Sequence, residues 1–211
     1  MAIKPILFNT EMVRAILDGR KTCTRRLVRF LPGKNPQWTG YIRNGLMLYN
    51  GRNEPCIRNL PYQPGDILYV RETWGYPIFL NSDKQYVFRA DKIAESGFKN
   101  DSHIWHPSIN MPKEAARIWL KVTDVRMERL QDITPKDAKN EGVGNLFYED
   151  IAYSEKNYGT EVDPEYGIAK EQFAWLWEST IKKSDIDRYG WGANPWVWVI
   201  EFERCEKPEG V

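Results

Sequence analysis

The sequence has few of the residues that staple small folds or bind metals. Its 211 residues include three cysteines and two histidines, and no two cysteines form a CxxC pair. Neither a disulfide framework nor a zinc ribbon is therefore indicated. His103 and His106 have a spacing that suits a metal on a helix, but Pro107 follows at once, so we expect no metal site and no cofactor.

Long apolar runs and a net charge are also missing. The longest apolar run, 196–200, is far shorter than the roughly 20 residues of a membrane helix, and residues 1–5 lack a signal-peptide pattern. We therefore expect a cytoplasmic protein with no membrane partner, and no oligomeric state is predicted. The net charge is +1, so any attraction to nucleic acid must come from a local patch.

The length favours one domain, 1–211, that buries a substantial core and carries two insertions. The first insertion, about 31–63, is rich in Pro, Gly and Asn, and its Asn44-Gly45 pair predicts a hairpin between 41–43 and 46–48. The second, about 142–167, is polar with scattered tyrosines. Nine Trp, eleven Tyr and eight Phe suit a β-rich core and leave rings available to stack on bases.

Hydrophobic periodicity predicts an α+β fold with a central strand at 117–130. Thr10 is the expected N-cap of the first helix, and Gly19 is expected to end it. The remaining predicted strands are 5–8, 67–74, 86–90 and 196–202, and the predicted helices are 11–18, a two-turn helix after Thr134, and 168–183 with a buried stripe of Phe173, Leu176, Trp177, Thr180 and Ile181.

The most informative stretch is Gly19-Arg20-Lys21-Thr22-Cys23-Thr24-Arg25-Arg26, with four cations and two hydroxyls directly after the first helix. Runs of Lys and Arg are commonly solvated faces, so charge by itself does not establish a site. An extended backbone puts Lys21 and Thr24 on opposite faces, whereas a turn or bulge would bring the amine and the hydroxyl together. If the stretch is extended, Cys23 points away from both threonines, which favours its burial.

A distant carboxylate completes a plausible reactive group. The helix after Thr134 should end near Gly142, which leaves Glu141 in the last turn, where the helix dipole disfavours a carboxylate by about 0.3–1 kcal/mol. Such a residue is a candidate for function, although an exposed Glu at that place is also common. Thr24 would attack a carbonyl, Lys21 would shuttle the proton, and Glu141 would orient Lys21 or polarise a water.

The same cations also suit phosphate binding while an aromatic ring stacks on a base. Spacing does not choose between this and catalysis. The candidate ligand-binding residues are Arg20, Arg25, Arg26, Arg71, Glu72, Trp74 and Trp105.

Several features follow one another along the chain: the run 19–26, Pro64-Gly65-Asp66-Ile67-Leu68, the long strand, the helix ending at Glu141-Gly142 and a final aromatic strand. In this order they resemble the pattern of the ASCH domain family, which belongs to the PUA-like superfamily. The chain resembles the larger type often carried on phage and prophage genomes. The resemblance implies a mostly antiparallel β-barrel flanked by helices, with a cleft for nucleic acid or a modified nucleobase.

A compact bacterial branch of that family hydrolyses the acetyl amide of N(4)-acetylcytidine with a lysine, a threonine and a glutamate, which correspond to Lys21, Thr24 and Glu141. The resemblance thus implies a hydrolase of an amide carbon–nitrogen bond in an N-acylated nucleoside. Other relatives are thought to bind RNA, and some are similar to single-strand ribonucleases, so a non-catalytic RNA- or DNA-binding module and a ribonuclease are the alternatives. The doubled arginine after Thr24 and the two insertions depart from the family pattern.

Overall fold

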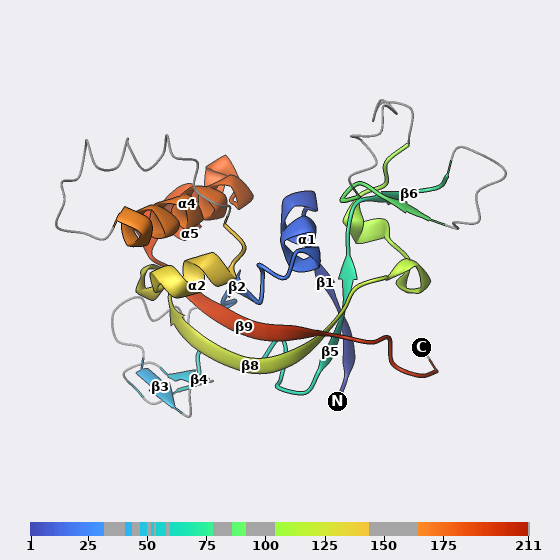
Figure 1. The fold of residues 1–211 in the computed structure, drawn as a ribbon. Helices are drawn as coiled ribbons and strands as arrows, with labels where there is room; N and C mark the ends of the chain where they lie inside the picture. Colours follow the sequence, from blue (N-terminus) through green and yellow to red (C-terminus); the bar gives the residue numbers. More distant parts are fainter. Residues whose placement is uncertain are drawn as a thin grey trace. The chain divides into compact units, whose positions relative to one another are not determined.

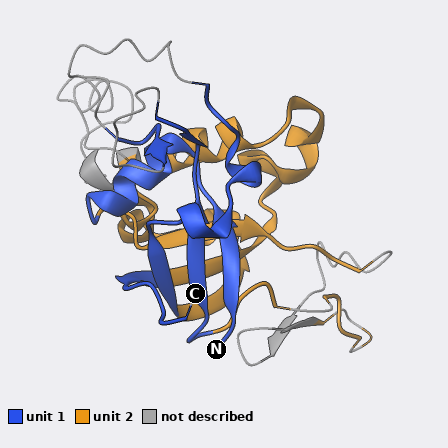
Figure 2. Ribbon diagram, turned by 90° about the vertical axis from the view of Figure 1, so that its right-hand side faces the viewer, with its two compact units in different colours: residues 1–19, 64–122, 202–211 blue, residues 20–63, 123–201 orange. Residues whose placement is uncertain are grey.

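The computed structural model describes residues 1–31, 41–43, 47–49, 52, 54–57, 60–77, 86–91, 104–143 and 164–210 (Figure 1). The chain divides into two compact units (Figure 2). Unit 1 comprises residues 1–19, 64–122 and 202–211, and unit 2 comprises residues 20–63 and 123–201. Within the described ranges, no helix has both the length and the apolar character needed to cross a bilayer.

The fold is α+β, as predicted. The strands are β1 (Ile3–Leu7), β2 (Cys23–Leu27), β3 (Tyr41–Arg43), β4 (Met47–Tyr49), β5 (Ile67–Arg71), β6 (Trp74–Gly75), β7 (Val87–Phe88), β8 (Trp119–Arg129) and β9 (Trp196–Cys205). The helices are α1 (Thr10–Leu17), α2 (Pro135–Asn140), α4 (Pro164–Thr180) and α5 (Ile186–Tyr189), with short 3-10 helices η3 (Ser108–Asn110), η4 (Lys113–Ala115), η5 (Leu130–Asp132), η6 (Lys183–Asp185) and η7 (Trp191–Ala193).

Five strands form a mixed sheet in the order β1-β5-β8-β9-β2. β1 runs parallel to β5, whereas β5 and β8, like β2 and β9, are antiparallel. The prediction that the long strand is central is confirmed, because β8 is the middle strand. Among the strands that the structure describes, β1 and β2 are the free edges of this sheet, so no closed barrel is formed.

The first helix of unit 1 begins one residue earlier than expected. The side chain of Asn9 accepts a hydrogen bond from the Met12 backbone N–H at 2.9 Å, so Asn9 is the N-cap of α1 and Thr10 is its first residue. The prediction of a Thr10 cap is wrong because Asn caps at least as well as Thr and precedes it here. Gly19 has φ 75° just past the helix, as a left-handed helix terminus requires.

The strand predicted at 67–74 is divided into β5 and β6 by Glu72 and Thr73. Glu72 is buried and accepts hydrogen bonds from Arg117 on both carboxylate oxygens, at 2.9 and 3.0 Å. β6 is antiparallel to β7, with Trp74 opposite Phe88. The buried core around them comprises Ile67, Trp74, Met111, Ala115, Ala116 and Trp119.

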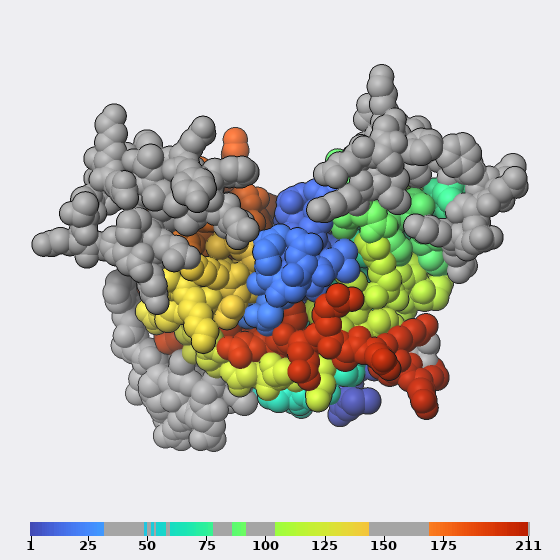
Figure 3. All heavy atoms as spheres, viewed as in Figure 1, coloured from blue at the N-terminus to red at the C-terminus, as the bar shows by residue number. Residues whose placement is uncertain are grey.

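The last residues of β9 and the tail after them belong to unit 1 and are largely exposed. Glu203 and Arg204 face solvent, and the red spheres of the C-terminal segment lie on the face turned to the viewer in Figure 3. Phe202, by contrast, is buried against Phe8, with ring centroids 6.2 Å apart. Phe202 is therefore the last buried residue of β9.

In unit 2, α2 lies as predicted. The Thr134 hydroxyl accepts a hydrogen bond from the Asp137 backbone N–H at 3.1 Å, Pro135 is the first helical residue, and Gly142 has φ 83° just past Glu141. This combination of cap, proline and terminal glycine determines where the helix begins and ends. Glu141 is consequently held as the C-cap residue.

The long helix of unit 2 and the predicted hairpin complete this unit. Of the stripe predicted on α4, Phe173 and Trp177 are buried, whereas Thr180 is exposed because the helix ends there. β3 and β4 are antiparallel, which confirms the hairpin, although Asn44-Gly45 lies outside the described residues. The core of this unit comprises Leu130, Ile133, Ala138, Ala169, Phe173, Trp177 and Val197.

Candidate functional site

The basic stretch begins with a contact to the end of α2. The Lys21 amine donates to the Glu141 carboxylate (Nζ to Oε2, 2.6 Å) and to the Glu141 backbone carbonyl at 2.8 Å. Lys21 and Glu141 also form an antiparallel bridge, and the Thr22 N–H donates to the Asn140 carbonyl at 2.9 Å. Lys21 is 2% and Glu141 3% exposed, so this ion pair is buried.

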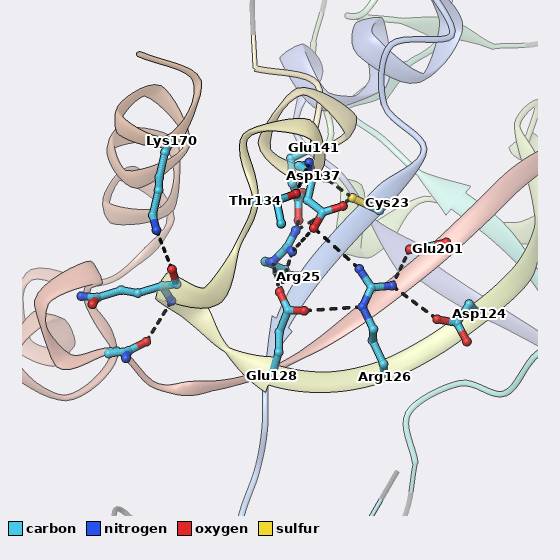
Figure 4. Close-up of polar contacts among 12 residues, drawn as sticks. Cys23, Arg25, Asp124, Arg126, Glu128, Thr134, Asp137, Glu141, Lys170 and Glu201 are labelled. Carbon is cyan, nitrogen blue, oxygen red and sulfur yellow. Dashed lines mark hydrogen bonds and ion pairs between the residues drawn. The ribbon is translucent and has the colours of Figure 1, made fainter. Parts of the chain in front are cut away.

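Arg25 joins the same carboxylate from β2. Its Nη1 lies 3.2 Å from Glu141 Oε1, and its Nη2 lies 2.6 Å from Glu128 Oε1 and 3.7 Å from Asp137 (Figure 4). The guanidinium also lies 5.7 Å from the ring centroid of Phe173. Burial disfavours the charged form of Arg25, but Glu141 and Glu128 outweigh this effect and leave its pKa above the ordinary value.

A second arginine extends the charged cluster along the sheet. Arg126 donates to Glu201 and lies 3.3 Å from Asp124 and 3.4 Å from Glu128 (Figure 4). Burial by itself would lower the pKa of Arg126, but the hydrogen bond and the charge of Glu201 raise it by more, so the net shift is upward. Cations and carboxylates therefore alternate along a series of ion pairs that runs from Arg25 on β2 to Glu128 and Arg126 on β8 and on to Glu201 on β9.

Sequence reasoning missed Asp124, Arg126, Glu128 and Asp137. The signal was present, since the first three alternate along β8 and therefore share one face of the strand. The sequence did not show that Asp137 of α2 lies near this face, 3.9 Å from Arg126. Without that contact, alternating charges predict only a solvated strand face.

Cys23 lies between the two cations and is buried, as expected. Its Sγ lies 3.8 Å from the Asp137 carbonyl oxygen. Burial raises the pKa of the Cys23 thiol to about 12, and the charge of Glu141 adds to this effect. The thiol is therefore protonated at neutral pH and is not a nucleophile.

Thr24 is buried on the opposite face of β2. Side chains alternate along a strand, so Thr24 and Arg26 point away from the face that bears Cys23 and Arg25. The register pairs Thr24 with Ile200, a core residue of β9. A hydrogen bond between Lys21 and Thr24 is not among the contacts of the described residues. The backbone is extended here rather than turned, so the Lys21 amine and the Thr24 hydroxyl lie on opposite faces of the chain.

The two remaining arginines of the stretch have separate contacts. Arg20 Nη1 donates to the Gly142 carbonyl at 3.1 Å and so adds a second link to the end of α2. Arg26 is half-buried, and burial lowers its pKa, an effect that the nearby Tyr62 opposes. Both lie in unit 2 with Lys21 and Glu141.

The other predicted binding residues, Arg71, Glu72, Trp74 and Trp105, belong to unit 1. Arg71 donates to the Met111 carbonyl at 2.8 Å, and Glu72 is paired with Arg117. The ring centroid of Trp74 lies 4.9 Å from that of His106 and within 6 Å of the ring centroids of Tyr76 and Tyr86. The contacts of Arg71, Glu72 and Trp74 thus lie within their own unit, and Trp105 is half-buried.

No group of three or more His, Cys, Asp and Glu side chains that could hold a metal ion is found in the described parts of the chain. No protein-family model, curated protein or solved structure matches the chain. Its function must therefore be inferred from the side chains themselves.

Proposed function

We propose that the protein is an ASCH-type, PUA-like protein of the cytoplasm that hydrolyses the amide of an N-acylated nucleobase or nucleoside. Lys21, Thr24 and Glu141 are its reactive groups. The observation that carries this proposal is the buried contact of Lys21 with Glu141 at 2.6 Å. It joins two residues that the family pattern associates but that lie 120 positions apart.

Hydrolysis proceeds in two steps, acyl transfer to Thr24 and then hydrolysis of the resulting ester. The Thr24 oxygen bonds to the acyl carbon, the carbon–nitrogen bond breaks, and the exocyclic nitrogen of the base takes a proton and leaves as the amine. Water then cleaves the threonine ester, which releases the carboxylic acid and restores the hydroxyl. Lys21 carries the proton between these partners, and Glu141 orients its amine.

A second candidate is binding without catalysis. It is favoured by the position of Thr24, which lies on the face of β2 opposite to Cys23 and Arg25, and by the burial of Lys21 and Glu141. In this case the ion pair stabilises the end of α2, and the ligand is recognised by arginines and aromatic rings.

The test is turnover of free N(4)-acetylcytidine, measured as cytidine released on a chromatography column. Thr24→Val keeps the side-chain shape and removes the hydroxyl, and Thr24→Ser restores it, so the proposal predicts loss in the first variant and recovery in the second. Lys21→Met should be inactive as well. Thr22→Val is the matched control, because Thr22 is an exposed hydroxyl two positions away. Full activity of Thr24→Val, or no release of cytidine by folded wild-type protein, would overturn hydrolysis at this site.

A further inference from the structure

One edge of β2 carries backbone groups that no strand among the described residues pairs with. The Val28 N–H donates to the Trp196 carbonyl at 3.0 Å, and Leu27 lies opposite Val197, so every second residue of β2 is in a hydrogen-bonded pair with β9. Arg25 and Leu27 lie between these pairs. Their backbone N–H and C=O groups therefore point away from β9, toward the edge of the sheet.

This edge is occupied before and after β2 but not along it. Just before β2, the Thr22 N–H donates to the Asn140 carbonyl at 2.9 Å, so the end of α2 takes the edge there. After β2, the Leu31 N–H donates to the Cys56 carbonyl at 2.8 Å. The segment between these two contacts, residues 25–29, is called the open edge below.

A groove of about 1560 Å³ in unit 2 runs along the open edge. Its wall includes Leu27 and Arg26, whose side chains lie on opposite faces of β2, so the groove passes around the edge instead of covering one face. On the Leu27 side the wall continues over Ile181, which packs against the same core as Leu27, and on to α5. On the Arg26 side it includes Trp196, two residues before Trp198, which lies opposite Arg26.

The groove has an excess of positive charge. Among the described residues of its wall, six are Lys or Arg and two are Asp, whereas the net charge of the whole chain is +1. Arg29, Lys182 and Arg188 are exposed cations of this wall, and none of them forms a salt bridge within the described parts of the chain. Charge complementarity therefore favours an acidic ligand.

The donors and acceptors of the open edge narrow the class of ligand further. Arg25 and Leu27 each direct one N–H and one C=O outward, and an extended peptide offers both kinds of group at the matching spacing. The phosphates of a nucleic acid only accept hydrogen bonds, so they would leave both carbonyls without a donor. A second copy paired through the same edge would place the arginines of two identical strands beside one another, and like charges across a strand pair are destabilising.

We infer that the open edge binds an extended acidic segment of a partner protein as an additional strand of the sheet. Alternate side chains of such a strand point to opposite faces, so its acidic residues meet Lys182 and Arg188 and the apolar residues between them meet Trp196. The partner is a protein, so the inference goes beyond amide hydrolysis and holds whether or not Lys21 and Glu141 are catalytic.

The charge requirement is tested with a fluorescein-labelled six-residue peptide of alternating glutamate and valine, whose binding to the full chain is measured by fluorescence anisotropy. Lys182→Ala with Arg188→Ala removes two exposed cations of the groove, and Lys183→Ala with Lys136→Ala removes two exposed cations that do not line it. The groove variant should bind about tenfold more weakly, and the control should stay within about twofold of wild type. Equal losses in the two variants, or no binding by folded wild-type protein, would overturn the inference.

The backbone requirement is tested on the peptide, so that the protein stays unchanged. One version is N-methylated at its glutamates and the other at its valines, which removes the N–H donors along one edge of the strand and keeps every charge. Because only one edge of an added strand faces β2, one version should lose binding and the other should keep it. An equal effect of both methylations would show that the peptide does not pair with the edge and would reject the inference.

Other occupants give different results in the same assays. If oligothymidine of equal length displaces the peptide at a lower concentration than unlabelled peptide does, the groove is a nucleic-acid site and the assignment fails. A dimer of the protein in sedimentation that the peptide dissociates would assign the open edge to a second copy instead. Peptide binding without release of cytidine would support this inference and reject the hydrolysis, so the two proposals fail separately.

Discussion

Glu141→Gln removes one negative charge from a buried group of ions while keeping the shape of the side chain. Glu141 Oε2 accepts from Lys21 at 2.6 Å and Oε1 lies 3.2 Å from Arg25. Neither the Lys21 nor the Arg25 side chain has any exposed surface. The variant therefore removes the carboxylate charge beside the buried Lys21 amine, whereas Arg25 keeps Glu128.

The expected loss in the free energy of unfolding is about 3 kcal/mol. Removing one partner of a buried ion pair typically costs about 3–5 kcal/mol, and the lower value applies because Glu128 and Asp137 still neutralise Arg25. For a chain of this length, about 2–4 °C of melting temperature corresponds to each kcal/mol, so the expected fall is about 6–12 °C.

Urea unfolding at pH 7, followed by circular dichroism, measures this difference. The control is Glu11→Gln, where the carboxylate is 75% exposed and pairs with Arg14 one helical turn away at 2.9 Å. An exposed pair of this kind contributes at most about 0.5 kcal/mol. If Glu141→Gln cost no more than this control, the buried ion pair would not stabilise the fold and the reasoning would be refuted.

A double variant separates charge from shape. In Lys21→Met with Glu141→Gln neither partner leaves an unpaired charge, so this protein should be more stable than Glu141→Gln alone. A double variant that is less stable by the sum of the two single losses would show that Lys21 and Glu141 do not interact energetically.

Two further predictions concern titratable groups. Burial raises the pKa of the Cys23 thiol from 9.0 to about 12, so above pH 9 the folded chain keeps a proton that the unfolded chain releases. Between pH 9 and 10.5 the free energy of unfolding of wild type should therefore fall by up to about 1.4 kcal/mol per pH unit relative to Cys23→Ala. Urea-stability curves of the two proteins that run parallel over this pH range would contradict the prediction. Burial raises the pKa of the Glu72 carboxyl, and the paired Arg117 opposes this rise. Arg117→Met should therefore lower the free energy of unfolding by about 3–5 kcal/mol at pH 7, and part of this loss should be recovered as the pH falls to 5 and Glu72 is protonated. Lys121→Met breaks an exposed ion pair with Glu203 and should show neither the loss nor the recovery in the same urea assay.

Local signals in the sequence predicted where α2 begins and ends, whereas the bounds of α4 were predicted at 168–183 and lie at Pro164–Thr180. Thr134, Pro135 and Gly142 define α2 because each has a conformational or hydrogen-bonding preference that acts within a few residues. The hairpin of β3 and β4 follows from the same kind of local preference. Such signals do not depend on which other part of the chain lies nearby.

The errors arose where a distant partner decides the local structure. The strand predicted at 67–74 is divided at Glu72, whose buried carboxylate pairs with Arg117, 45 positions later in the chain. The N-cap at Asn9 is a different case, since two adjacent residues were both suitable and the sequence offers no measure that separates them.

For the candidate site, the sequence by itself determined the residue types and the alternation of the basic stretch. It placed Lys21, Cys23 and Arg25 at every second position and put Glu141 at the end of a well-capped helix. Only the tertiary structure decided that this helix end lies against the stretch, so that Lys21 and Arg25 share one carboxylate. It also decided that Thr24 faces Ile200 and the other side of the sheet, because strand pairing, unlike capping, depends on a partner some 175 residues away.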